Sequence, residues 1–196
     1  MAKRPEVLTQ MDERGLSQHE AEQVLAKADC LYNLGKVDAA LTQLAESVTA
    51  ECAGLDLLVL GVMNGAVVTL GKLLSLLLFP LQVDYLQVSR YRQNTQGGEL
   101  TWLAKPQQSL LGRDLLVVDD VLDRGETLAE IKRYCLAEGA ASVRLLALVQ
   151  KQLAAPAVVE ADYVGLQAPD RFLFGCGMDY RGYLRNAPGI FAVKGL

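Results

Sequence analysis

The stretch LLVVDDVLDRGETLAEIKRY, residues 115–134, changes from an apolar strand pattern to a helical pattern and carries three aspartates at the change. A continuous apolar run of this kind is typical of a strand that is buried on both faces of a parallel sheet. Ligands of open α/β sheets bind outside the carboxyl ends of the strands. The position of Asp119, Asp120 and Asp123 therefore makes them candidate ligand-binding residues.

The same alternation of short apolar runs and helical segments continues through the chain from Asp56 onwards. The apolar runs are LDLLVLGV, LQVDYLQV, LLVVDD and SVRLLALVQ, and the helical segments are GAVVTLGKLLSLLLF and TLAEIKRYCLAEG. We therefore expect an α/β fold with a mostly parallel, twisted sheet flanked by helices. Residues 89–109 are polar and contain the pair Gly97–Gly98, which predicts a long exposed hairpin or loop.

Two helices are expected before the sheet. Ser17 and Glu20 form a capping-box pattern, and apolar positions at helical spacing follow them to a break near Gly35. A second amphipathic run covers residues 37–52 and ends before Gly54.

Composition limits the classes of protein to which the chain can belong. Its 196 residues are 51% hydrophobic, which suits one domain, and a net charge of −4 gives no basic surface for nucleic acid or an anionic membrane. Polar residues interrupt the longest apolar stretch, and residues 1–15 lack the apolar region of a secretory signal, so we expect a cytoplasmic protein. Four cysteines without CxxC spacing are each expected to be buried, reduced and structural, namely Cys30, Cys52, Cys135 and Cys176.

The turn after the apolar strand has the features of a phosphate site. Thr127 with Glu130 predicts a second capping box, so that a helix begins at about Thr127 after the loop 123–126. The positive end of the helix dipole then faces the loop, and Gly125 allows the backbone to come close to a ligand. Carboxylates beside such a site suit the hydroxyls of a phosphorylated sugar, although a solvated acidic turn is the alternative. Walker and dinucleotide patterns are absent.

The segment VVDDVLDRGETL, residues 117–128, resembles the phosphoribosyl pyrophosphate loop of type I phosphoribosyltransferases. Further segments resemble the hypoxanthine-guanine branch of that family, and together they cover roughly residues 56–195. These segments are VMNG (62–65), SRYRQNTQGGEL (89–100), LVQK (148–151) and DRFLFGCGMDYRGYLRNAPGIFAVKG (170–195).

The resemblance implies a type I phosphoribosyltransferase fold and a division of the chain. It implies one domain over residues 1–196, with N-terminal helices in 1–54 and a core in 55–165. A flexible lid loop is expected at about 89–109, and a small purine-binding hood is expected in 166–196.

The resemblance also implies an activity. Such enzymes transfer the 5-phosphoribosyl group from phosphoribosyl pyrophosphate to hypoxanthine or guanine, giving IMP or GMP and pyrophosphate, with help from Mg²⁺. It implies small-molecule substrates, no nucleic acid or membrane partner, and a homodimer or homotetramer. Two alternatives stay open: an enzyme that prefers xanthine, and a non-catalytic regulator that senses phosphoribosyl pyrophosphate while binding nucleic acid.

The resemblance assigns the purine contacts and the catalytic role. Asp123 matches the residue proposed to exchange a proton with the purine ring, and Phe172 matches the aromatic that stacks on the base. The backbone of Leu173 would read the exocyclic edge of the base. Lys151 would donate to the 6-oxo group, and because a 6-amino group offers this lysine no acceptor, adenine should be a poor substrate.

The remaining assignments concern phosphoribosyl pyrophosphate, the metal and the lid. The family's pyrophosphate loop can contain a cis peptide, expected here between Val62 and Met63, and Met63 replaces a basic residue found in some members. Mg²⁺ would be held by Asp179 together with Asp119 and Asp120, and the lid motif is Ser89, Arg90 and Tyr91. The implied phosphoribosyl pyrophosphate contacts are Met63, Asn64, Gly65, Asp119, Asp120, Asp123, Arg124, Gly125, Glu126, Thr127 and Arg185.

Overall fold

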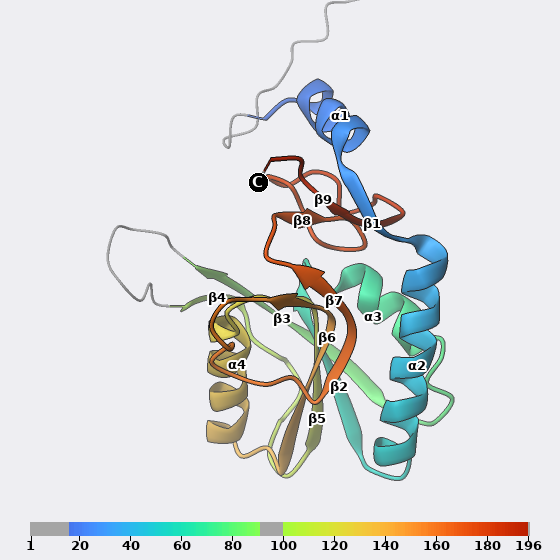
Figure 1. The fold of residues 1–196 in the computed structure, drawn as a ribbon. Coiled ribbons are helices and arrows are strands. Elements are labelled where there is room, and N and C mark those ends of the chain that lie inside the picture. Colours follow the sequence, from blue (N-terminus) through green and yellow to red (C-terminus); the bar gives the residue numbers. More distant parts are fainter. Residues whose placement is uncertain (1–15, 91–99, 196) are drawn as a thin grey trace, which may run out of the picture.

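The computed structural model describes residues 16–90 and 100–195, which form two sheets and four helices (Figure 1). The larger sheet has six strands in the order β4–β3–β2–β5–β6–β7. All neighbouring pairs in it are parallel except β3 with β4, as a mostly parallel sheet requires. Its strands are β2 (Leu57–Met63), β3 (Gln82–Arg90), β4 (Leu100–Ala104), β5 (Asp114–Leu122), β6 (Ser142–Gln152) and β7 (Tyr163–Pro169).

Helices cover both faces of this sheet. Helices α2 (Leu34–Cys52) and α3 (Val67–Leu74) lie on one face, and α4 (Glu126–Ala137) lies on the other (Figure 1). Alternate residues of β5 belong to the two hydrophobic clusters: Leu116 and Val118 pack with α2 and α3, whereas Leu115 and Val117 pack with α4. Burial on both faces is why this strand has a continuous apolar sequence.

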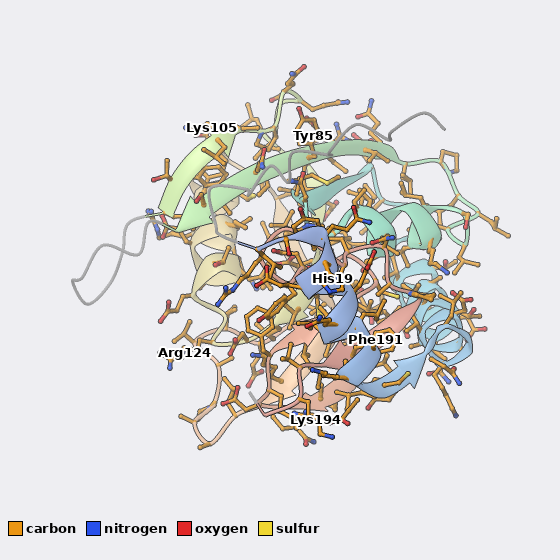
Figure 2. All side chains as sticks on the ribbon, turned by 90° about the horizontal axis from the view of Figure 1, so that it is seen from above. His19, Tyr85, Lys105, Arg124, Phe191 and Lys194 are labelled. Carbon is orange, nitrogen blue, oxygen red and sulfur yellow. The ribbon has the colours of Figure 1, made fainter. Side chains whose placement is uncertain are left out.

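The smaller sheet, called the hood below, combines the two ends of the described chain. It consists of β1 (Asp29–Asn33), β9 (Gly189–Ala192) and β8 (Leu173–Phe174), which are antiparallel and lie in that order. Helix α1 (Gln18–Lys27) lies over the hood, away from the six-stranded sheet, and Figure 2 shows it from above with His19 near the centre of the view.

Strand β1 corrects the sequence-based expectation that the first helix continues to near Gly35. The helix ends at Lys27, and the following segment pairs with β9, with Cys30 opposite Phe191 and Asn33 opposite Gly189. Pairing with a strand that is distant in the sequence overrides the local helical spacing. The capping box at Ser17 is confirmed, because its hydroxyl accepts a hydrogen bond from the backbone N–H of Glu20.

Three of the four cysteines are buried as expected, but Cys30 is exposed. Cys30 lies in β1, none of whose residues is fully buried. The two strands of the hairpin expected at 89–109 are present, since β3 and β4 pair antiparallel. Residues 91–99 between them lie outside the described part of the chain. The N-terminal segment 1–15 also lies outside it. Within the described residues, every helix is too short or too polar to cross a membrane.

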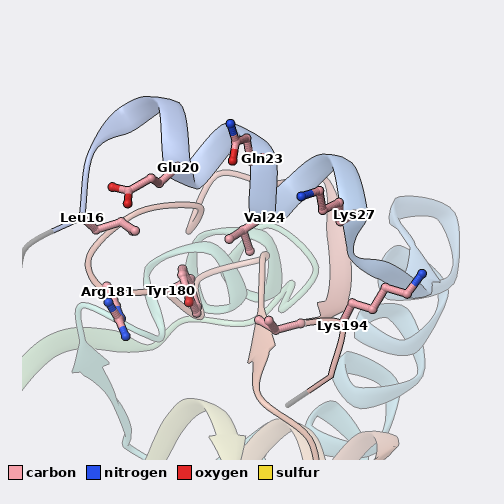
Figure 3. Close-up of a pocket in the computed structure, with 9 residues that line it drawn as sticks. Leu16, Glu20, Gln23, Val24, Lys27, Tyr180, Arg181 and Lys194 are labelled. Atoms are coloured by element: carbon pink, nitrogen blue, oxygen red, sulfur yellow. The ribbon is translucent and has the colours of Figure 1, made fainter.

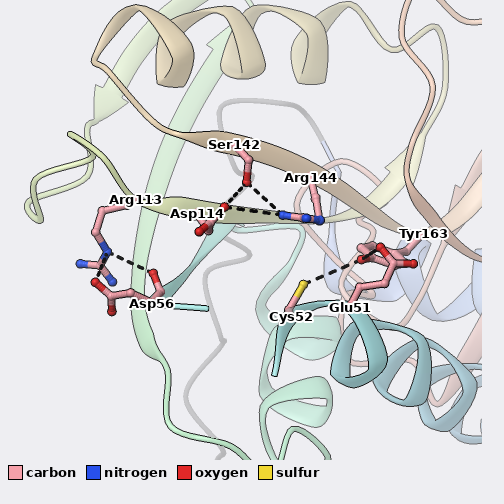
Figure 4. A network of polar contacts seen from close by, with 8 residues as sticks. All are labelled: Glu51, Cys52, Asp56, Arg113, Asp114, Ser142, Arg144 and Tyr163. Carbon is pink, nitrogen blue, oxygen red and sulfur yellow. Dashed lines mark hydrogen bonds and ion pairs between the residues drawn. The ribbon is translucent and has the colours of Figure 1, made fainter. Parts of the chain in front are cut away.

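Polar contacts fasten the amino ends of β2, β5 and β7 (Figure 4). The guanidinium of Arg113, just before β5, pairs with Asp56 at 3.1 Å. The hydroxyl of Tyr163, at the start of β7, donates to Glu51 of α2 at 2.8 Å. Burial and this hydrogen bond raise the pKa of the Tyr163 phenol, so it keeps the proton that it donates. These contacts fix the amino edge of the sheet, opposite the edge where a ligand is expected.

The packing of α2 on the sheet can be tested with Leu41, which is buried in the cluster shared by α2, α3 and β5. We expect Leu41→Ala to lower the free energy of unfolding by about 2–5 kcal/mol, because it leaves a cavity in a packed core. The exposed neighbour Gln43→Ala should change it by less than about 0.5 kcal/mol. Urea unfolding curves measure both, and equal effects of the two substitutions would contradict this packing.

Candidate active site

Two buried carboxylates lie near the carboxyl end of β5. Asp119 and Asp120 are 9% and 7% exposed, and Asp119 accepts a hydrogen bond from the backbone N–H of Asp120 at 2.9 Å. Burial raises the pKa of Asp119 well above its usual range, and the neighbouring charge of Asp120 adds to the effect. Burial also raises the pKa of Asp120. Neither side chain forms an ion pair with another described residue, so these buried acids are costly for folding and mark a candidate site.

Three segments that are distant in the sequence meet at Asp120. A Cβ atom on Gly65 would lie 2.4 Å from a carboxylate oxygen of Asp120. A Cβ atom on Gly177, which has a φ of +109°, would lie 2.1 Å from the carbonyl oxygen of Gly65. Glycine is therefore required at both positions. The loop after β2, the end of β5 and the hood are in direct contact here.

Arg185 links the hood turn to the same point. Its guanidinium donates to the carbonyl of Gly177 at 2.6 Å and pairs with Asp179 at 2.6 Å. The other carboxylate oxygen of Asp179 accepts the backbone N–H of Gly182 at 2.6 Å. The positive charge of Arg185 opposes the burial effect on the pKa of Asp120. The structure thus brings the predicted pyrophosphate arginine and the predicted metal ligand Asp179 close to the β5 carboxylates.

The loop after β5 enters the helix earlier than the sequence predicted. Gly125 is the N-cap, with a φ of 79°, and α4 begins at Glu126. The predicted capping box of Thr127 with Glu130 is wrong, because the Glu130 carboxylate binds Arg133 at 2.9 Å instead. The left-handed conformation of Gly125 lets the chain turn into the helix at once. The positive end of the α4 dipole faces this loop, as a phosphate site requires, and the exposed Arg124 lies at the periphery (Figure 2).

A lysine and an aspartate lie side by side on neighbouring strands. Leu122 of β5 is paired with Gln150 of β6, so the residues that follow them, Asp123 and Lys151, are adjacent. The ammonium of Lys151 lies 2.9 Å from a carboxylate oxygen of Asp123 and 3.7 Å from one of Asp170. The Lys151 side chain is only 13% exposed, unlike an ordinary surface lysine. The site therefore presents a hydrogen-bond donor beside an acceptor.

An exposed aromatic ring lies between β7 and β8. Phe172 is 42% exposed, which is unusual for a large apolar side chain that only packs in a core. Its ring meets that of Tyr180 edge to face, with centroids 5.4 Å apart and an angle of 83°. Its neighbour Leu173 is buried in β8 and pairs with Ala192 of β9. The hood thus holds Phe172 firmly while leaving its ring available.

The loop VMNG differs from expectation in one bond. The cis peptide joins Met63 to Asn64, one bond later than the Val62–Met63 bond predicted from the sequence. Met63 ends β2 and is partly buried, whereas Asn64 is exposed. The Met63 side chain packs against the core cluster of α2 and α3, and this packing fixes the residue before the turn.

The lid motif is described only in part. Ser89 lies in β3 opposite Thr101 of β4, and Arg90 is the last residue of β3. Tyr91 lies outside the described residues. Three residues that approach the predicted site residues were given no role in the sequence analysis: Asp170 beside Lys151, Tyr180 against Phe172, and Gly177 against Gly65. For Asp170 a signal existed, because it follows a strand end just as Asp123 does.

The raised pKa of Asp119 predicts how stability depends on pH. Between the ordinary carboxyl pKa and the raised one, the folded chain keeps a proton that the unfolded chain releases, so stability falls as pH rises through this window. Asp119→Asn removes the ionisation but keeps an oxygen that can accept the Asp120 N–H. We expect this variant to be more stable than the parent at neutral pH, because the unfolded parent gains free energy by releasing a proton that its folded state keeps.

The gain should shrink as the pH is lowered below about 4, because the unfolded parent chain then binds the proton as well. Urea unfolding at a series of pH values measures it. A difference between the two proteins that does not change with pH would contradict the assignment of a buried, ionisable carboxylate.

Comparisons with known proteins place the chain in a family. A family model described as a phosphoribosyl transferase domain matches residues 28–181. The hypoxanthine-guanine phosphoribosyltransferase of Lactococcus lactis is 33% identical over 153 residues, which are 78% of this chain and 83% of that protein. A bifunctional protein TilS/HprT of Listeria innocua is 35% identical over 155 residues, but this chain, 79% of which is aligned, covers only 24% of its length.

A solved structure supports the same conclusion. The crystal structure of a hypoxanthine phosphoribosyltransferase from Staphylococcus aureus superposes with a TM-score of 0.82 at 27% identity, over 87% of this chain and 94% of that one. The range that the family model matches includes the β5–α4 turn and the Lys151–Asp123 pair of this chain. The chain therefore belongs to the phosphoribosyl transferase domain family and, within it, to the hypoxanthine-guanine phosphoribosyltransferases.

Proposed function

We propose that this protein transfers the 5-phosphoribosyl group of phosphoribosyl pyrophosphate to hypoxanthine or guanine and releases pyrophosphate. The observation that carries the proposal is the pair of Lys151 and Asp123, whose donor and acceptor atoms lie 2.9 Å apart. A 6-oxopurine presents an acceptor, its 6-oxygen, next to a ring N–H donor. The base can thus replace the ion pair with two charge-assisted hydrogen bonds, one to each partner.

Adenine does not match the same pair. Its 6-amino group is a donor and would face the ammonium of Lys151, which has no acceptor to offer. The partly buried lysine would then lose its partner, and such a loss is a strong source of discrimination. The exposed ring of Phe172 supplies a flat apolar surface on which a purine can stack.

The remaining contacts hold the sugar and the two phosphate groups. In this proposal the turn 123–127 binds the 5′-phosphate at the start of α4, where the helix dipole favours an anion. Asp119 and Asp120 lie next to this turn, where they can accept hydrogen bonds from the ribose hydroxyls. Pyrophosphate contacts the loop 63–65 and Arg185, which the contact of Gly177 with Gly65 holds together.

The reaction exchanges one bond to the ribose for another. The bond from C1 to the pyrophosphate oxygen breaks, a bond from C1 to a purine ring nitrogen forms, and the purine loses a ring proton. Asp123 is the acid–base group placed to receive or stabilise that proton, because it would already hydrogen-bond the ring N–H. A cation-like sugar centre is open to capture by water, and a closed lid would prevent this.

The carboxylates of the candidate site suit Mg²⁺, which also takes oxygen ligands from its substrate. Within the described residues no three His, Cys, Asp or Glu side chains gather into a cage, and Mg²⁺ commonly uses only one or two carboxylates. Its candidate ligands are Asp119, Asp120 and Asp179, of which one or two would contact the ion directly and the others through water. When bound, the ion would neutralise charge on the leaving pyrophosphate.

The proposal also covers the oligomeric state and the location of the protein. By its resemblance to the family we propose a cytoplasmic homodimer or homotetramer, which light scattering coupled to size exclusion can test. A preference for xanthine is the second candidate for the substrate, since the 2-position of the base would be read by the backbone near Leu173 and not by a side chain.

Initial rates test the proposed activity directly. With phosphoribosyl pyrophosphate and Mg²⁺, we expect turnover of hypoxanthine and guanine and little turnover of adenine, with xanthine offered as the fourth base. Asp123→Asn should lower kcat by about 10²–10⁴-fold, because it removes the proton acceptor. Asp56→Asn, which changes an exposed carboxylate at the opposite edge of the sheet, should leave kcat within about twofold.

Folded protein that binds phosphoribosyl pyrophosphate but turns over none of the four bases would contradict the proposal. That result would favour the regulator instead, and a filter-binding assay at several salt concentrations would then test nucleic-acid binding.

The role of Lys151 in base recognition makes a separate prediction. We expect Lys151→Met to lower kcat/KM for hypoxanthine by about 30-fold or more, because the 6-oxygen loses a charged donor. The KM for phosphoribosyl pyrophosphate should change by less than about twofold, since that ligand has other partners. Lys132→Met on α4 serves as the control, and equal losses for hypoxanthine and adenine in Lys151→Met would count against this role.

A further inference from the structure

Helix α1 forms one wall of a cavity that the proposed activity does not use. The helix precedes residues 28–181, the part of the chain that the family model matches. Its residue Val24, together with Ala28, packs against a small cluster in the hood that includes Phe174 and Val193. The cavity between helix and hood measures about 330 Å³, which reaches the range of small-molecule sites of roughly 300–1,000 Å³. Its lining is Leu16, Glu20, Gln23, Val24, Lys27, Tyr180, Arg181, Val193 and Lys194.

The charges in this cavity are unevenly distributed. Figure 3 places Glu20 and Arg181 toward the start of α1, and Lys27 and Lys194 toward its end. Glu20 already accepts hydrogen bonds from the N–H and hydroxyl of Ser17, and the positive charge of Arg181 helps to lower its pKa. Among residues 16–90 and 100–195, no carboxylate lies within ion-pair distance of the ammonium of Lys27 or Lys194. The end of the cavity that these lysines line is therefore suited to an anion.

Apart from Gln23, the rest of the lining is apolar or aromatic. Leu16 is buried, Val24 is half-buried, and the half-buried ring of Tyr180 carries the guanidinium of Arg181 at 5.7 Å from its centre. A ligand that reaches from the lysines to Tyr180 must therefore have an anionic group at one end and a flat apolar group at the other.

Two residues of this lining also touch the proposed purine-stacking residue. The ring of Tyr180 meets that of Phe172 edge to face at 5.4 Å. The backbone N–H of Val193 donates to the carbonyl of Phe172 at 2.9 Å. The cavity and the proposed purine site thus border on each other through Tyr180 and Val193, and a ligand that shifts Tyr180 must change the contacts of Phe172.

We propose that this cavity is a second binding site, for a small aromatic anion, and that its occupancy changes the affinity for the purine base. The anionic group lies between Lys27 and Lys194, and the aromatic group packs on Val24 and Tyr180. Coupling of the two sites requires that Tyr180 and Phe172 have a second arrangement besides the one seen here and that the ligand bind the two arrangements unequally. The effect on the base rests on the proposed function, whereas the binding itself does not.

Calorimetric titration of the whole chain with phenyl phosphate tests the binding. We expect a dissociation constant below about 1 mM, and weaker binding of inorganic phosphate, which has no ring. The double variant Lys27→Gln/Lys194→Gln should weaken the binding of phenyl phosphate about tenfold or more, since it removes both charged donors. Lys36→Gln/Lys132→Gln, with the same change of net charge outside the cavity, should alter it by less than about twofold. Benzoate in place of phenyl phosphate distinguishes a carboxylate from a phosphate.

The outcomes separate the two proposals. The second site is overturned if the parent chain does not bind phenyl phosphate. It is also overturned if both double variants bind it equally, which is the result expected when the probe binds at the turn 123–127 instead. Binding at the cavity with no change in the KM for hypoxanthine, measured on active enzyme with and without phenyl phosphate, overturns the coupling. If the protein binds phenyl phosphate through Lys27 and Lys194 but has no transferase activity, the second site stands and the proposed function is wrong.

Discussion

The burial of β5 on both faces is the constraint on which the rest of the site depends. The strand lies at the centre of the six-stranded sheet, between the core under α2 and α3 and the core under α4. Because both faces are covered, its register with β2 and β6 cannot slip without moving apolar side chains out of the cores. This fixed register carries Asp119 and Asp120 into a buried position and places Asp123 beside Lys151.

The hood is positioned on the six-stranded sheet by close contacts between backbone segments. Gly177 approaches the carbonyl of Gly65, and Gly65 approaches the carboxylate of Asp120, so side chains at either glycine would force the segments apart. The hood in turn exists because β1, near the N-terminal end of the described chain, pairs with β9 near the C-terminal end. Segments from both ends of the chain therefore set the position of Phe172 relative to the acid–base pair on β5 and β6. Each half of the proposed purine site is held by a different sheet.

The sequence predicted the parts of this structure that have a local signal. Strands β2, β3, β5 and β6, the helix after β5 and the acidic residues of the turn follow from hydrophobic periodicity and from residue type, whereas β7, β8 and β9 were not predicted. The resemblance named the family. Strand β1 could not be found this way, because DCLYN is a strand only through its partner β9. The capping box at Thr127 failed because Gly125 takes a left-handed conformation that starts the helix earlier. The contacts of Tyr180 with Phe172 and of Gly177 with Gly65 join separate turns, and nothing in the local sequence encodes them.

The central claim is that the ion pair of Lys151 and Asp123 is the recognition element for a 6-oxopurine. The most direct measurement is a crystal structure of the protein with IMP bound. We expect the ammonium of Lys151 to leave Asp123 for the 6-oxygen, and the base to stack on Phe172 with its imidazole edge toward Asp123. An intact Lys151–Asp123 ion pair, with the base bound away from both side chains, would contradict it.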